Sequence, residues 1–176
     1  NTKQIMLILL ALGMTFIFGK IIYININAHP IEVPRDITKS KYMKTLYRGV
    51  SLSSKRAKFA KKGIAKPFKG NASIEEHRNG NTRSGRTSWT ERPSIAVPYA
   101  NYDQYGNPCD GYILEKRFDL NSPDVFNVND LRDGGDLFNE VEFIIKGLIS
   151  GCKVYYVPAG SDPMAVETQI YLNQNF

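Results

Sequence analysis

Two glutamates one residue apart, Glu140 and Glu142, form the pattern in this sequence best suited to electrostatic or acid–base chemistry. Their segment, 140–145 (EVEFII), has the composition of a strand. Side chains two residues apart on a strand project from the same face, so both carboxylates are expected side by side. Burial of such a pair without partners is costly, which indicates a site; two solvated acids on an exposed edge strand are the alternative.

Arg48 and the segment Ser88-Trp89-Thr90 add a guanidinium and two hydroxyls to this set. A guanidinium on a strand can bind a phosphate or a carboxylate in bidentate fashion. The hydroxyls of Ser88 and Thr90 point the same way on a strand, so they can hydrogen-bond a carboxylate on a neighbouring strand. Trp89 is expected to point to the opposite face, into the core. A surface arginine and ordinary strand hydroxyls are the alternative interpretation.

The elements that position these residues are mostly strands. Strands are predicted at 44–50, 87–90, 111–118, 125–128, 140–145, 153–157 and 169–172. Helices are predicted after the capping residues 51–54 as far as Lys62 and over 93–100, with polar loops at 66–86 and 133–139. Several strands without regular helices between them favour an α+β fold with a largely antiparallel core.

The order of these motifs resembles the Arg–Ser–Glu class of ADP-ribosyltransferase toxins. Leu46-Tyr47-Arg48 is followed by a helix, a polar loop with His77, S-x-T and then E-x-E. The likeness is greatest to the A chains of cholera toxin and the heat-labile enterotoxins, in which the string FNVND, here at 126–130, also precedes E-x-E by a similar distance. The resemblance covers roughly 44–157, with Ser88-Trp89-Thr90 in place of the family's Ser-Thr-Ser.

The resemblance implies an ADP-ribosyltransferase-like split antiparallel β core with short flanking helices. It implies an enzyme that uses NAD⁺ as substrate and transfers ADP-ribose to arginine on a target protein. Glu142 would stabilise the oxocarbenium-like transition state and Ser88 would position Glu142. Glu140 would orient and deprotonate the acceptor guanidinium. An NAD glycohydrolase on the same fold, with water as acceptor, is the alternative.

The same resemblance implies the residues that bind NAD⁺. Arg48 would hold the phosphates or the adjoining ribose, and Tyr47, His77 and Thr90 are expected to contact NAD⁺ as well. The loop at 133–139, which includes Phe138, lies where the family recognises its acceptor. The stretch after residue 157 is shorter than the C-terminal part of a cholera-type A chain, so a delivery or activator subunit would be bound in another way.

An uncharged apolar run over 5–19 lies between Lys3 and Lys20. Its length matches the core of a signal peptide, about 7–15 residues, better than the ~20 residues of a spanning helix. Residues 1–28 are therefore expected to direct secretion and to be removed, which leaves 29–176 as the catalytic domain. An uncleaved membrane anchor over 5–26 and a buried core helix are the alternatives.

The charge is unevenly distributed along the chain. Residues 39–92 contain 15 Lys or Arg and 3 Asp or Glu, whereas residues 93–176 contain 5 and 12. A basic half can attract nucleic acid, an acidic membrane or a dinucleotide diphosphate. Aromatic residues are not interleaved with the basic run, so nucleic acid is not expected as a partner. A membrane-tethered basic binding module without catalysis is the second class of function.

The two cysteines, Cys109 and Cys152, admit two interpretations. After export they could form one disulfide, or they could be two unpaired core residues. With only two histidines in the chain, they form no recognisable zinc-binding pattern, so no metal is expected.

Overall fold

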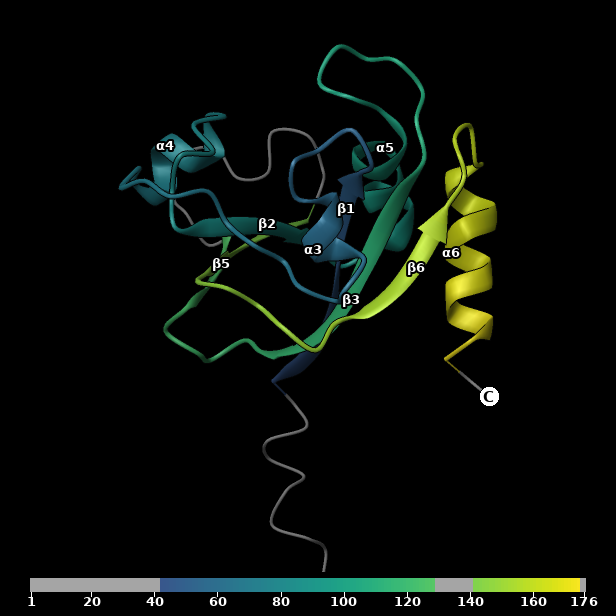
Figure 1. The fold of residues 1–176 in the computed structure, drawn as a ribbon. Coiled ribbons are helices and arrows are strands. Elements are labelled where there is room, and N and C mark those ends of the chain that lie inside the picture. Colours follow the sequence, from purple (N-terminus) through teal and green to yellow (C-terminus); the bar gives the residue numbers. More distant parts are fainter. Residues whose placement is uncertain (1–41, 129–140, 175–176) are drawn as a thin grey trace, which may run out of the picture. The chain divides into compact units, whose positions relative to one another are not determined.

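The computed structural model describes residues 42–128 and 141–174, which form a six-stranded sheet flanked by short helices (Figure 1). The strands are β1 (Met43–Ser51), β2 (Arg86–Thr90), β3 (Gly111–Asp119), β4 (Val125–Asn127), β5 (Glu142–Lys146) and β6 (Lys153–Val157). The helices are α3 (Ala57–Ala60), α4 (Ile74–Arg78), α5 (Pro93–Asn101) and α6 (Pro163–Leu172). Every neighbouring pair in the order β4-β5-β2-β1-β3-β6 is antiparallel, which confirms the expected antiparallel core.

The sheet is nearly divided in two between β1 and β2. These strands are paired only at Tyr47 and Thr90, whereas β1 pairs with β3 along its whole length and β2 does so with β5. Figure 1 shows β2 and β5 running across the direction of β1 and β3. The two three-stranded halves, β4-β5-β2 and β1-β3-β6, therefore diverge beyond a single pair of residues.

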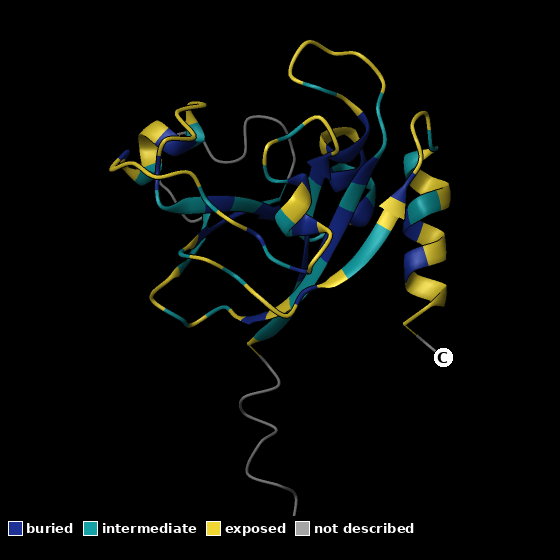
Figure 2. Ribbon diagram, viewed as in Figure 1, coloured by how far each residue is buried: buried dark blue, intermediate teal, exposed yellow. Residues whose placement is uncertain are grey.

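Side chains alternate between two apolar clusters on the two faces of β1 and β3. Leu46 and Leu114 belong to one cluster, with Trp89 packed edge-to-face on Phe118. The adjacent residues of the same strands pack beneath α5 and α6, in the second cluster. The buried colouring of Figure 2 follows these central strands. Trp89 is 2% exposed, so its prediction as a core residue is confirmed.

Helix α5 lies directly on β1 and β3, and two glycines make this close approach possible. A Cβ atom on Gly49 would lie 2.0 Å from the carbonyl oxygen of Ala96, and one on Gly111 would lie 2.1 Å from that of Ala100. Real Cβ atoms do not approach backbone so closely. The glycine that follows Arg48 is thus required by the packing of α5 on the strand that bears Arg48.

Two segments adopt a different secondary structure from the one predicted. Residues 169–172 do not close the sheet but end α6, a helix that the Asp162 side chain caps at the backbone N–H of Met164. The predicted loop at 66–86 contains α4, which a capping box between Ser73 and Glu76 initiates. Both helices begin with a recognisable signal, since an aspartate before proline and an S-x-x-E motif each favour a helix start.

Other predictions concern the chain's ends, its helices and its cysteines. Helix α3 is one turn long, shorter than predicted, although Gly63 does adopt the left-handed conformation of a helix stop. Cys109 and Cys152 are unpaired. Among residues 42–128 and 141–174, no helix is long and apolar enough to cross a membrane. The segment 1–28 and the loop at 133–139 lie outside the described residues.

Candidate active site

A cavity of about 990 Å³ lies where the two halves of the sheet diverge. Its volume is at the upper end of the range for small-molecule sites, about 300–1,000 Å³. Residues of β1, β2, β5, α4 and α5 line it. It brings together six of the residues predicted from sequence: Tyr47, Arg48, His77, Ser88, Thr90 and Glu142.

Glu142 is the first residue of β5 and lies directly opposite Thr90 of β2. Directly opposed residues of an antiparallel pair project from the same face. Ser88 is on that face as well, two residues along β2, where its direct partner is Ile144. The carboxylate of Glu142 therefore shares one face with both hydroxyls, with Thr90 beside it and Ser88 diagonal to it.

Glu140 lies outside the described residues. Its neighbour Val141 bears on the expectation that one strand carries both glutamates of the E-x-E motif. Val141 has φ 47°, in the left-handed region that a β-branched residue rarely adopts. Strand β5 therefore begins at Glu142, and the prediction of a continuous strand from Glu140 was wrong. Because Val141 is not extended, strand alternation no longer places the two carboxylates on one face. Such backbone strain, of order 1–3 kcal/mol, is typical of functional sites.

His77 joins the site from α4. Its Nε2 lies 3.1 Å from the hydroxyl of Ser88, and its Nδ1 is hydrogen-bonded to the hydroxyl of Ser84. Burial, and next the positive charge of Arg48, hold the pKa of His77 below its ordinary value of 6.5. A neutral imidazole has one donor and one acceptor nitrogen, so the two serine hydroxyls fix its orientation. Ser84 is fully buried and was missed, because a serine in a polar loop has no distinctive sequence signal.

Arg48 crosses from β1 to β2. Its Nη1 donates a hydrogen bond of 2.6 Å to the backbone carbonyl of Ser88. This bond uses one of the five N–H donors of a guanidinium, so the group can hold β2 and still bind an anion. Burial, and next the charge of Arg56, lower the pKa of Arg48 to about 10, so it stays protonated at neutral pH.

Tyr47 also lines the cavity, but its ring belongs to the second apolar cluster. It is 2% exposed, and its hydroxyl accepts a hydrogen bond of 2.7 Å from Gln174. Burial raises its pKa to about 12. These contacts give the Tyr47 side chain a packing role, on the opposite side of β1 from Arg48.

The described part of the cavity lining carries more positive than negative side chains. Among the described residues that line it, Arg48, Lys55, Arg56 and Arg78 are cationic, and Asp103 and Glu142 are the carboxylates. No group of three His, Cys, Asp or Glu side chains that could hold a metal ion occurs within 42–128 and 141–174. The arrangement suits an anionic ligand with a reacting centre close to Glu142.

The buried state of His77 predicts a pH dependence of stability. Its pKa in the folded protein is below 6.5, so at lower pH the unfolded chain takes up a proton that the folded protein does not. The free energy of unfolding is therefore expected to fall as the pH is lowered through about 6.5. Urea denaturation between pH 7.5 and 5.5 should show this fall in the wild type and a smaller one in His77→Asn. Equal slopes in the two proteins would contradict the buried neutral imidazole.

The chain matches no protein-family model, and the curated proteins include none similar to it. Its function has to be inferred from the residues that surround the cavity.

Proposed function

We propose that this protein is an NAD⁺-dependent mono-ADP-ribosyltransferase that modifies arginine on a target protein. The observation that supports this most is the convergence of Arg48, Ser88 and Glu142 on one cavity. These residues lie on three strands and were selected from the sequence as a basic, a hydroxyl and an acidic motif in that order. A sheet divided into two three-stranded halves, with the cavity at the division, also fits the split β core expected of such enzymes.

Glu142 is assigned the main electrostatic role. When the bond between nicotinamide and ribose breaks, nicotinamide leaves with the bonding electron pair and positive charge develops on the ribose. A fixed carboxylate beside the ribose lowers the barrier, because its attraction to the ribose grows as the positive charge moves there from the nicotinamide ring. Thr90 lies directly opposite Glu142 on the neighbouring strand. Ser88 lies on the same face, and its hydroxyl is hydrogen-bonded to His77, so both residues are assigned the role of positioning Glu142.

Glu140 is assigned the acceptor step. A protonated guanidinium is a poor nucleophile, so a base must remove a proton as its nitrogen forms the new bond to the ribose carbon. Export through residues 1–28 and a delivery partner remain part of this proposal.

Glu140→Gln separates transfer from hydrolysis. We expect this variant to lose transfer of ADP-ribose to agmatine, a soluble arginine mimic, by about 100-fold or more. Release of nicotinamide without agmatine should persist, since Glu142 is unchanged. Radiolabelled agmatine product and free nicotinamide are measured in the same samples. Equal loss of both activities would refute the separate roles, and wild-type nicotinamide release without agmatine labelling would favour a glycohydrolase.

A further inference from the structure

A second guanidinium, that of Arg56, lines the cavity from the start of α3. It comes from a different element than Arg48, which is on β1. The sequence did not single it out, because it lies among several lysines and has no distinctive motif of its own. In the structure it is half-buried, unlike the exposed Lys58, Lys61 and Lys62 of the same run.

Phe68 fixes the position of Arg56. The guanidinium carbon lies 3.0 Å from the centroid of the Phe68 ring, a stacked cation–π contact. Phe68 itself lines the cavity and is 42% exposed. Exposure of an aromatic ring to solvent does not stabilise the fold, so the contact with Arg56 gives this ring a role at the cavity. Stacking uses the flat face of a guanidinium, whereas bidentate bonds to phosphate use its N–H edge. The ring therefore holds Arg56 without competing for a phosphate ligand.

The two guanidiniums repel each other in this protein. Burial lowers the pKa of Arg56 to about 10, and the charge of Arg56 contributes to the lowered pKa of Arg48. The charge of Glu142 raises the pKa of Arg48, but this single negative charge does not balance two guanidiniums. Two desolvated like charges facing one cavity are costly unless an anion binds between them. A ligand with two adjacent negative charges compensates both.

We infer that Arg48 and Arg56, the latter held by Phe68, form a clamp for a diphosphate group. The identification of this diphosphate as that of NAD⁺ rests on the proposed function. The clamp would place the diphosphate beside Arg48 and Arg56. The ribose that carries nicotinamide could then lie next to Glu142. Arg56 and Phe68 are then binding residues specific to the diphosphate and are not needed for a nucleoside.

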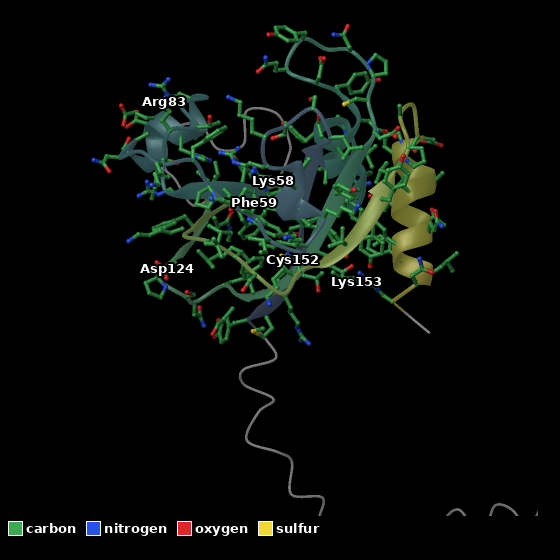
Figure 3. The ribbon with its side chains drawn as sticks, in the orientation of Figure 1. Lys58, Phe59, Arg83, Asp124, Cys152 and Lys153 are labelled. Carbon is green, nitrogen blue, oxygen red and sulfur yellow. The ribbon has the colours of Figure 1, made fainter. Side chains whose placement is uncertain are left out.

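The test is calorimetric binding of ADP and of adenosine to the full chain and its variants. Arg56→Gln is expected to weaken ADP binding about 10- to 100-fold, the usual loss for a charge-assisted contact, and to change adenosine binding less than about 2-fold. Phe68→Leu should weaken ADP binding about 3-fold or more, because Arg56 keeps its charge but loses its support. Arg83→Gln is the matched control, since Arg83 is exposed, lies beside α4 and does not line the cavity (Figure 3).

Loss of ADP binding in Arg56→Gln but not in Arg83→Gln would support the clamp. Equal weakening in both would show only a general effect of charge, and unchanged ADP affinity in Arg56→Gln, or no ADP binding by the wild type, would overturn it. NAD⁺ turnover is measured separately. If ADP binding depends on Arg56 but the protein does not turn over NAD⁺, the clamp stands and the proposed enzymatic function is refuted. If the protein turns over NAD⁺ and Arg56→Gln leaves the KM for NAD⁺ unchanged, the enzymatic function stands and the clamp is refuted.

Discussion

Glu142→Gln is expected to lower the rate of nicotinamide release from NAD⁺ by about 100- to 1,000-fold. Glutamine has the same shape but no charge, so the variant loses the attraction to the developing positive charge and keeps the packing at the start of β5. A 100-fold loss corresponds to about 2.7 kcal/mol of transition-state stabilisation. Binding of ADP should not weaken, because the diphosphate is assigned to other residues, so the loss should be in kcat.

Glu115→Gln is the matched control for this prediction. Glu115 is also a half-buried glutamate on a strand of the same sheet, but it accepts hydrogen bonds from Tyr155 and Gln174 and does not line the cavity. Its replacement should leave kcat for nicotinamide release within about 3-fold. Similar losses in the two variants would mean that the effect comes from the fold and not from a charge at the reacting centre.

Gly49→Ala is expected to destabilise the protein by about 3 kcal/mol or more. The new methyl group would lie 2.0 Å from the carbonyl oxygen of Ala96 and 2.8 Å from the backbone nitrogen of Ala100. Both atoms are backbone of α5, so the whole helix must move away from β1. In a domain of this size, thermal unfolding should shift down by roughly 6–12 °C. Differential scanning calorimetry measures the change.

Gly85→Ala provides the comparison for this variant. A Cβ atom there meets nothing within 4 Å, and Gly85 has no positive φ. The same substitution should therefore be neutral or should stabilise by about 0.4–1 kcal/mol, through the unfolded chain alone. If Gly49→Ala were as stable as Gly85→Ala, the close packing of α5 on β1 would be disproved.

The sequence predicted the strands well because their signal is local. Alternation in GYILEKRF and the β-branched and aromatic residues of KVYYV predict strands, and both segments are strands, β3 and β6. The prediction of a strand at 169–172 was wrong because this segment, taken alone, has a strand-like composition. Its membership of α6 depends on Asp162 and Pro163, which begin the helix several residues earlier. The capping box at Ser73 was a usable signal that the polar character of its loop obscured.

The candidate site was only partly predictable, because its geometry comes from the sheet and not from any one motif. Arg48 and Ser88 are 40 residues apart and meet only because β1 and β2 separate after one pair. Ser84 and Arg56 belong to residue types that are common in loops, so only their burial and contacts distinguish them. Tyr47 was selected by its place beside Arg48, but strand alternation turns its ring to the other face.

The central claim is tested most directly with labelled NAD⁺ and agmatine, on the purified wild type and Glu142→Gln in parallel. The account predicts that the wild type transfers labelled ADP-ribose to agmatine and that Glu142→Gln loses about 100-fold or more of this activity. Circular dichroism of both proteins would establish that they are folded. No turnover of NAD⁺ by the folded wild type, or undiminished transfer by Glu142→Gln, would contradict the account.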